Sequence, residues 1–96
     1  MPAYVIVDVD VHDPEGYAEY RQLSGASVAQ YSGQFIVRGG AVEVAEGDWQ
    51  PGRFVVIQFS SMEQAKTWYN SPEYTAARAI RQRYSTGKLL FVEGVA

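Results

Sequence analysis

The chain has 96 residues, of which 47% are hydrophobic and 20% are charged, and its formal net charge is −3. This size favours one domain with one core over residues 1–96, and the acidic balance argues against nucleic acid as a partner. The lack of cysteine excludes disulfides and thiolate zinc sites. No apolar run is long enough to span a membrane. Because no secretory signal is visible, we expect a cytoplasmic protein.

The first predicted element is a strand over residues 3–11, because apolar residues alternate with other residues along it. One of its faces consists of four valines, which we expect to lie under helices: Val5, Val7, Val9 and Val11. The opposite face combines an aromatic ring, an aliphatic chain and two carboxylates: Tyr4, Ile6, Asp8 and Asp10. The strand is therefore expected to separate a core from a mixed second face.

A helix is predicted to start at Asp13-Pro14-Glu15. Aspartate caps helices, proline suits the first helical position, and an acid in the first turn interacts favourably with the helix dipole. Apolar residues recur at helical spacing as far as Ser32-Gly33, where we expect Gly33 to end the helix in the left-handed conformation. Gly25, inside the helix, should mark a kink or a place of close packing.

Residues 33–59 are predicted to form a hairpin made of a long broken strand, a turn and a central strand that folds back beside it. The run Phe54-Val-Val-Ile57 is rich in β-branched and aromatic residues, as is typical of a strand buried on both faces. Gly39-Gly40 interrupts the partner strand, and we expect a β-bulge there.

Two shorter helices are predicted after the hairpin. Ser60 and Glu63 have the spacing of a capping box for the first of them. Ser71-Pro72 is expected to end that helix and begin the next, because proline disfavours helix in the residue before it and is accepted at a first helical position. The last of these helices is predicted to end at Gly87, before a final strand over residues 88–93.

The element order β-α-β-β-α-β predicts a ferredoxin-like α+β fold, a four-stranded antiparallel sheet with helices on one face. The other face, which we call the open face, must be solvated or covered by something else. The residues expected on it are Tyr4, Ile6, Asp8, Asp10, Ile36, Arg38, Phe54, Val56, Gln58, Phe91 and Glu93. Because this surface is too apolar for a soluble monomer and too polar for a core, we expect a homodimer formed through it around a partly polar cavity.

Four stretches together resemble the domain of unknown function 1330 family, over essentially the whole chain. They are Arg38-Gly39-Gly40, Glu46-Gly-Asp-Trp49, Arg53–Phe59 and Trp68-Tyr-Asn-Ser-Pro-Glu-Tyr74. The resemblance implies membership of the dimeric α+β barrel superfamily, whose ferredoxin-like sheets pair into a barrel, and therefore a homodimer. Superfamily relatives include cofactor-free quinol monooxygenases, muconolactone isomerases and haem-binding peroxidases, so the resemblance implies no single chemistry.

We expect the ligand to be a small organic molecule bound on the open face, where a few polar groups converge on a largely apolar surface. The residues predicted to bind it are Tyr4, Asp8, Arg38, Phe54, Gln58, Trp68, Tyr69 and Phe91. If there is catalysis, Asp8 is the candidate general base and Arg38 the candidate anchor for an anion or oxyanion. We expect no cofactor, and chemistry like that of cofactor-free monooxygenases or isomerases is the nearest analogy.

An equally favoured alternative is a non-catalytic structural dimer with a filled interior, in which the charged groups form a buried ion pair that fixes register. For Trp68 and Tyr69, core packing is preferred to a role in a pocket wall, because adjacent helical positions cannot both face the core squarely.

A metal site and an RNA-binding surface are both disfavoured. Asp8, Asp10 and His12 share a strand face and carry suitable metal donors, but a solvated strand end beside a helix cap explains them more simply. The RNA recognition motif has the same topology, and Tyr4 and Phe54 fall near its aromatic positions. However, no ring stands at the second stacking position, and the carboxylates would repel phosphates. We therefore predict no metal, nucleic-acid or membrane partner.

Overall fold

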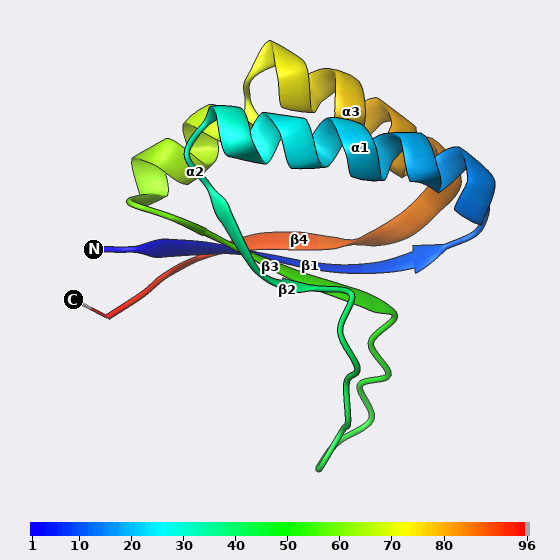
Figure 1. Ribbon diagram of the computed structural model, residues 1–96. Coiled ribbons are helices and arrows are strands. Elements are labelled where there is room, and N and C mark those ends of the chain that lie inside the picture. Colours follow the sequence, from blue (N-terminus) through cyan, green and yellow to red (C-terminus); the bar gives the residue numbers. More distant parts are fainter. Residues whose placement is uncertain (96) are drawn as a thin grey trace.

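The computed structural model describes residues 1–95 and has two layers, a sheet and a set of helices on one of its faces (Figure 1). The sheet is antiparallel, with strand order β2-β3-β1-β4. Its strands are β1 (Ala3–Val11), β2 (Gln34–Arg38), β3 (Arg53–Phe59) and β4 (Ser85–Glu93). The helices are α1 (Pro14–Gln30), α2 (Met62–Tyr69) and α3 (Pro72–Tyr84). The predicted ferredoxin-like α+β fold is confirmed.

The core lies between the sheet and the helices, and the alternation predicted for β1 is confirmed. Val5, Val7 and Val9 are buried, and Phe59 of β3 is buried beside them. Trp68 of α2 has no exposed surface, and its ring centroid lies 5.4 Å from that of Phe59. Burial of each such side chain contributes about 1.5–3 kcal/mol, which places the helices on this face of the sheet.

Two helix starts are confirmed as predicted. Asp13 caps α1, because its Oδ1 accepts hydrogen bonds from the amides of Glu15 and Gly16 at 3.1 and 3.2 Å. Ser71 caps α3, because its Oγ accepts the amide of Tyr74 at 3.1 Å. In both cases proline follows the cap, so the missing amide costs the helix no hydrogen bond.

Two other helix ends differ from the prediction by one residue. The cap of α2 is Ser61, whose Oγ accepts the Gln64 amide at 3.0 Å, so the capping box predicted at Ser60 is wrong. At the end of α1, Ser32 has the positive φ of 63° that was expected of Gly33. Gly33 is needed for space instead, since a Cβ there would lie 2.7 Å from the ring of Phe59.

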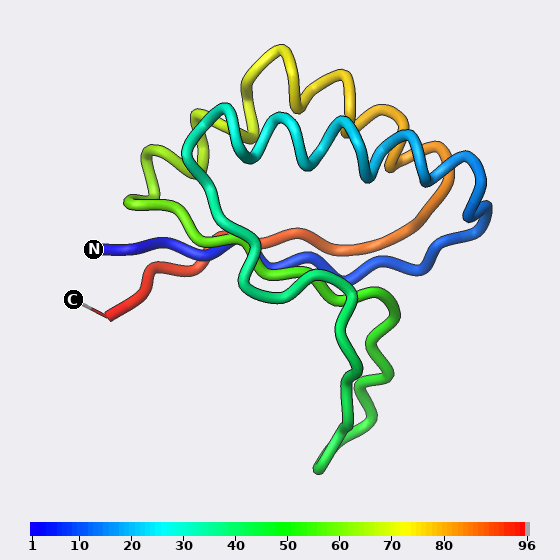
Figure 2. Tube along the Cα trace, in the orientation of Figure 1, coloured from blue at the N-terminus to red at the C-terminus, as the bar shows by residue number. Residues whose placement is uncertain are grey.

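Residues 39–52 form an arm rather than part of the predicted long broken strand. β2 ends at Arg38, and the chain then leaves the sheet on the side away from the helices before it returns as β3. Figures 1 and 2 show this arm projecting well below the plane of the sheet. The hairpin is therefore short in its paired part and long in its loop.

The bulge in β2 lies between Phe35 and Val37, not at Gly39-Gly40. An extra residue in one strand reverses the face that the following side chains take. Arg38 consequently pairs with the buried Val55 and lies on the helix side. The expected position of Arg38 on the open face is wrong, and Ile36 is the unpaired residue of the bulge.

The boundary between α3 and β4 lies earlier in the chain than Gly87, where it was predicted. The helix ends at Tyr84 and the strand begins at Ser85, so Gly87 lies inside the strand and not at its start. A Cβ at Gly87 would lie 2.4 Å from the carbonyl oxygen of Asp8, so β1 approaches the β4 backbone closely at this point. The glycine thus serves sheet packing rather than chain reversal.

The register of β4 places Phe91 and Glu93 on the helix side, opposite to the prediction. Phe91 pairs with Val5, and Glu93 pairs with Ala3, both of them buried under the helices. Residues 89–92 are apolar on both faces, so alternation in the sequence could not indicate which of them point inward. The open face receives Leu90 from β4 instead, opposite Ile6.

Candidate functional site

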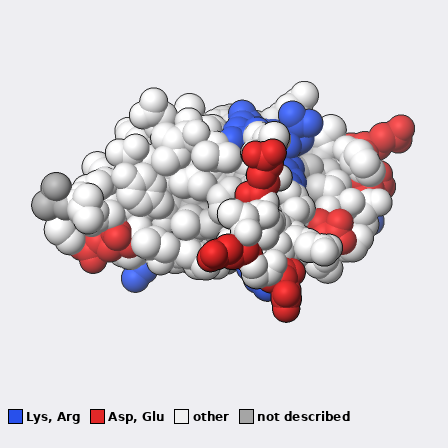
Figure 3. Space-filling model, turned by 90° about the horizontal axis from the view of Figure 1, so that it is seen from below, with Lys and Arg blue, Asp and Glu red and all other residues white. Residues whose placement is uncertain are grey.

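The open face of the sheet is a mixed apolar surface, as predicted from β1 and β3. Tyr4, Phe54 and Gln58 lie on it, half-buried, and Leu90 of β4 is 47% exposed. Seen from this side, a broad uncharged surface covers much of the molecule, with carboxylates at separate points (Figure 3). No element within residues 1–95 packs over it as the helices pack over the other face.

Asp8 anchors the arm to the open face. Its Oδ2 accepts a hydrogen bond from Trp49 Nε1 at 2.8 Å, and its Oδ1 accepts one from the Gly52 amide at 2.9 Å. The Trp49 ring also packs edge-on against Phe54, with centroids 5.8 Å apart. Both oxygens of the candidate general base therefore have a structural partner.

A groove of about 440 Å³ lies between the arm and the open face, and Trp49 and Leu90 are among the residues that line it. It contains one of the predicted ligand-binding residues, Asp8. The sequence did not indicate that Trp49 would lie here, because the arm brings it to β1 from 41 positions away.

The strand end near His12 has the structure of a capped turn. His12 Nε2 lies 3.1 Å from Thr86 Oγ1, and Asp13 is occupied as the helix cap. In the described part of the chain, no three histidine or carboxylate side chains are grouped as metal ligands. The same residues contain no helix long and apolar enough to cross a membrane.

Four of the predicted ligand-binding residues belong to the helix side: Arg38, Trp68, Tyr69 and Phe91. Trp68 is fully buried, packs 4.1 Å from the ring of Tyr74, and donates from Nε1 to Ser27 Oγ at 3.0 Å. Tyr69 packs edge-on against Phe91 at 5.5 Å. The preferred core interpretation of Trp68 agrees with this packing, and none of these four residues lies on the open face with Asp8.

Arg38 extends from β2 towards α1. Its Nη2 donates to the carbonyl oxygen of Arg21 at 2.8 Å, and its guanidinium lies 4.1 Å from the centroid of the Phe35 ring. Gly25 of α1 faces this guanidinium, since a Cβ there would lie 3.2 Å from Nη2. Close packing at Gly25 was predicted, and Arg38 is the group that packs there.

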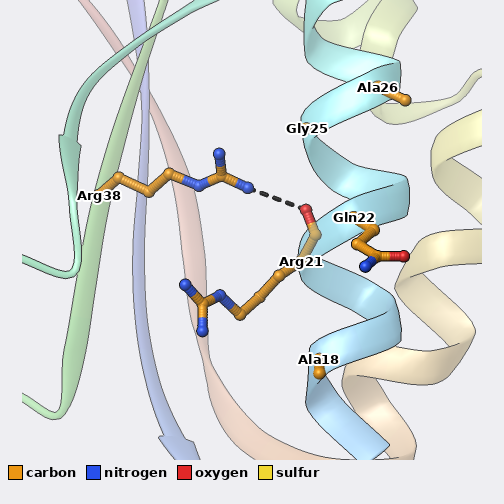
Figure 4. A pocket seen from close by; sticks show the side chains of 6 residues that line it. All are labelled: Ala18, Arg21, Gln22, Gly25, Ala26 and Arg38. Carbon is orange, nitrogen blue, oxygen red and sulfur yellow. Dashed lines mark hydrogen bonds between the residues drawn. The ribbon is translucent and has the colours of Figure 1, made fainter.

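A crevice of about 630 Å³ lies between α1 and Arg38, and we call it the Arg38 crevice (Figure 4). It is lined by Ala18, Arg21, Gln22, Gly25, Ala26 and Arg38. Figure 4 shows the guanidinium groups of Arg21 and Arg38 in the space between the helix and the strand. Two cations from different elements thus converge on one opening.

Behind the crevice, a small cavity of about 20 Å³ continues into the core, with Arg38, Arg53, Tyr17 and Tyr20 in its wall. This volume suits about one water molecule. Burial raises the pKa of Tyr17, and the neighbouring Arg53 opposes that shift. The hydroxyl of Tyr20 lies 2.9 Å from that of the buried Tyr74, so the cavity adjoins a pair of hydrogen-bonded phenols.

The electrostatics of the crevice are dominated by cations. Although Arg38 is an exposed residue, partial burial of its guanidinium lowers its pKa, and repulsion by Arg53 and then Arg21 lowers it further. Within residues 1–95, the side chains that shift its pKa are arginines and tyrosines, with no carboxylate among them. The arrangement favours a negative charge from outside.

The sequence indicated Arg38 but missed Arg21, Arg53 and Tyr17. A signal existed for the helix, since Tyr17, Arg21 and Gly25 are four residues apart and share one face. No signal existed for Arg53, whose position depends on where β3 begins after the arm. A Cβ at Gly39, which has a φ of 73°, would lie 2.4 Å from Arg53 Nη1, so glycine is required where this side chain crosses the chain.

The family model of a domain of unknown function, DUF1330, matches residues 2–95. The chain belongs to the DUF1330 family. This confirms the resemblance drawn from the sequence, and the match covers every element described above. No curated protein matches this DUF1330 chain in sequence.

Solved structures similar to this DUF1330 chain share its fold at low identity. A protein of unknown function from Rhodopseudomonas palustris has a TM-score of 0.74 at 17% identity, over 99% of this chain and 83% of that one. SnoaB, a cofactor-independent oxygenase from Streptomyces nogalater, has a TM-score of 0.63 at 10% identity, over 97% and 92%. A dimeric protein of unknown function with a ferredoxin-like fold, from Bacteroides fragilis, has a TM-score of 0.57 at 15% identity, over 97% and 96%. At these identities the likeness establishes the fold alone.

Proposed function

We propose that this DUF1330 chain forms a homodimeric α+β barrel through its open face and binds a small organic molecule in the Arg38 crevice of each subunit. One observation carries the binding part: Arg21 and Arg38 converge on an opening of about 630 Å³ between two elements. Small-molecule sites in proteins have volumes of about 300–1,000 Å³ and a few convergent polar groups.

The proposed ligand site lies on the helix side of the sheet, whereas the sequence predicted it on the open face. The groove at Asp8 has the less suitable chemistry, because both oxygens of that carboxylate accept hydrogen bonds from the arm. Arg38, in contrast, makes one side-chain hydrogen bond within residues 1–95, so most of its five N–H donors have no protein acceptor there. The Arg38 guanidinium in the crevice therefore has N–H donors available to a ligand, whereas the Asp8 oxygens on the open face already accept hydrogen bonds from the arm.

The dimer part rests on the open face. Its apolar side chains have no cover within the described chain, and soluble monomers rarely leave such a surface in water. The dimeric protein from Bacteroides fragilis, which shares the fold, supports the same assembly. Sedimentation equilibrium at micromolar concentration should give twice the chain mass of 10.7 kDa, and a monomer under these conditions would contradict the proposal.

The binding part is tested with three single-ring probes: benzoate, benzamide and benzyl alcohol. Amide ¹⁵N–¹H spectra of the dimer should show shifts at Gly25 and Gly39, the glycines beside the arginine side chains. Shifts confined to Trp49 and its neighbours would place binding in the open-face groove instead. Absence of shifts with all three probes would favour the structural dimer with a filled interior.

A cofactor-independent oxygenase is the second candidate function, supported by the shared fold of SnoaB. For this chain, buried phenols beside the crevice could hold or transfer a proton of a bound substrate, with Tyr17 the nearest to Arg53. Oxygen uptake by the purified dimer in the presence of a hydroquinone, lost in Tyr17→Phe, would support it. Equal uptake by the variant would count against a role for Tyr17.

A further inference from the structure

We propose that the ligand of the Arg38 crevice is an organic carboxylate, with its charged end between Arg38 and Arg21 and its apolar body along α1. This inference rests on the proposed function, because it names the ligand class of the same crevice. Four features of the chain carry it: unused donors, unbalanced charge, a fixed guanidinium and a helix face of small residues.

The donors of Arg38 are arranged for a carboxylate. A guanidinium is planar and offers five N–H groups in a fork that matches the two oxygens of a carboxylate. Within the described chain, the Arg38 side chain makes one hydrogen bond, in which Nη2 donates to the Arg21 carbonyl oxygen. The remaining donors, together with the Arg21 guanidinium shown beside it in Figure 4, are sufficient for a bidentate contact and a second charge.

The charge around the crevice is unbalanced. Burial lowers the pKa of Arg38, and repulsion by Arg53 and Arg21 lowers it further. A carboxylate bound beside Arg38 would offset this repulsion and raise the pKa again. Burial raises the pKa of the nearby Tyr17, so its phenol does not supply the missing negative charge.

The guanidinium of Arg38 is held in place before a ligand arrives. It lies 4.1 Å from the centroid of the Phe35 ring, within the range of a cation–π contact. The hydrogen bond from Nη2 to the Arg21 carbonyl oxygen of α1 also holds the tip of the Arg38 side chain. Such preorganisation reduces the entropy that binding must overcome.

The helix side of the crevice leaves room for an apolar body. Ala18, Gly25 and Ala26 are the small residues among its lining, and they belong to one stretch of α1. An added methyl group at Gly25 would approach Arg38 Nη2 to 3.2 Å, tighter than an ordinary contact. A ligand that combines one carboxylate with a compact hydrocarbon part fits both walls, whereas a bare inorganic anion would use only one.

Isothermal titration of the dimer with benzoate and benzamide tests the charge requirement, because the two probes share a ring and a similar size. Benzoate should bind at least about tenfold more tightly than benzamide, as expected when a hydrogen bond to a charged group is gained. Inorganic phosphate should bind more weakly than benzoate. Equal affinity for benzamide would overturn the carboxylate assignment while leaving the crevice as a binding site, and equal affinity for phosphate would overturn the apolar part of it.

One variant with a matched control locates the site. Arg38→Gln should weaken benzoate at least about tenfold and leave benzamide nearly unchanged. Arg83→Gln removes the same charge from an exposed position near the end of α3 and should change neither. Benzoate affinity that is unaffected by Arg38→Gln, or equally affected by Arg83→Gln, would overturn the proposal.

Gly25→Ala provides a variant that does not depend on loss of charge. Alanine favours a helix over glycine by about 0.5–1 kcal/mol, so the variant should fold at least as well as the parent chain. The new methyl group should displace the Arg38 guanidinium and weaken benzoate severalfold. Unchanged benzoate binding in a folded Gly25→Ala dimer would contradict the placement of the carboxylate beside Gly25.

Discussion

At the scale of single residues, Asp8 and Arg38 show what alternation along a strand can and cannot determine. The sequence placed both on the open face as a potential base and an anion anchor. Asp8 does lie there, but its oxygens hold the arm, and this contact depends on a loop whose path carries no periodic signal. Arg38 lies on the other face because the bulge between Phe35 and Val37 reverses the face to which its side chain points.

Asp8→Asn should loosen the arm. An amide side chain offers one acceptor oxygen, so either Trp49 Nε1 or the Gly52 amide loses its partner. We expect the free energy of unfolding to fall by about 0.5–1.5 kcal/mol in urea titrations.

Asp10→Asn is the control for the same change, since Asp10 is exposed at the next open-face position and has no side-chain hydrogen bond within residues 1–95. If both variants lost the same stability, net charge rather than the anchor would be responsible.

At the scale of elements, the type and order of helices and strands were predictable, and their ends were less so. The caps at Asp13 and Ser71 carry proline beside them and were located correctly. Ser60 and Ser61 are adjacent and chemically identical, so propensity cannot choose between them, and the tertiary path into α2 selects Ser61. In β4, an apolar run on both faces removed the signal for direction.

Replacement of the two serines distinguishes the observed cap from the predicted one. Ser61→Ala should destabilise the protein by about 1 kcal/mol, because the Gln64 amide loses its acceptor. Ser60→Ala should change the unfolding free energy by less than about 0.5 kcal/mol, since Ser60 is exposed. Urea midpoints measured side by side decide the matter, and a larger loss in Ser60→Ala would return the cap to the earlier residue.

The contact between the end of α1 and the start of α3 should make stability depend on pH. The Tyr31 hydroxyl donates to Glu73 Oε1 at 2.7 Å and holds the pKa of Glu73 below its ordinary value of 4.5. A carboxyl group with a lowered folded-state pKa stabilises the fold above its unfolded-state pKa, and this contribution is lost as pH falls through the folded-state value. Tyr31→Phe should therefore flatten the dependence of Tm on pH between about pH 5 and about pH 3.

Tyr84→Phe removes a hydroxyl that has no hydrogen-bond partner in the described chain, and it serves as the control for Tyr31→Phe. Its Tm should keep the parent dependence on pH. If Tyr31→Phe also kept the parent dependence of Tm on pH, the Tyr31 hydroxyl would not be what lowers the pKa of Glu73.

At the scale of the whole molecule, the chain has two layers, one sheet and one set of helices, and the proposed dimer would stack two such subunits through their sheets. Its Cα atoms span 32 × 30 × 16 Å, and the arm lengthens the molecule in the direction in which the helices and the sheet are stacked (Figure 1). Paired sheets lie about 10 Å apart, a distance that side chains such as Leu90 and Ile6 would fill from both sides. The order of the layers follows from the alternation of apolar and polar residues in the sequence.

Leu90→Lys should convert the proposed dimer to a monomer, because it places two charges at the paired faces. Leu23→Lys is the matched control, since Leu23 is 40% exposed on α1 and Leu90 is 47% exposed on the open face. Sedimentation equilibrium of the two variants should therefore give the monomer mass for the first and the dimer mass for the second. Two dimers, or two monomers, would exclude the open face as the specific interface.

The two tryptophans of the chain occupy opposite environments: Trp68 has no exposed surface, and Trp49 is 56% exposed at the root of the arm. They are also the only two indole rings in the sequence. Intrinsic fluorescence therefore separates into two independent signals, one from the interior and one from the surface that would meet a second copy. Replacing either ring by phenylalanine leaves the other as a built-in optical probe, so folding and association can be followed in the same protein without an added dye.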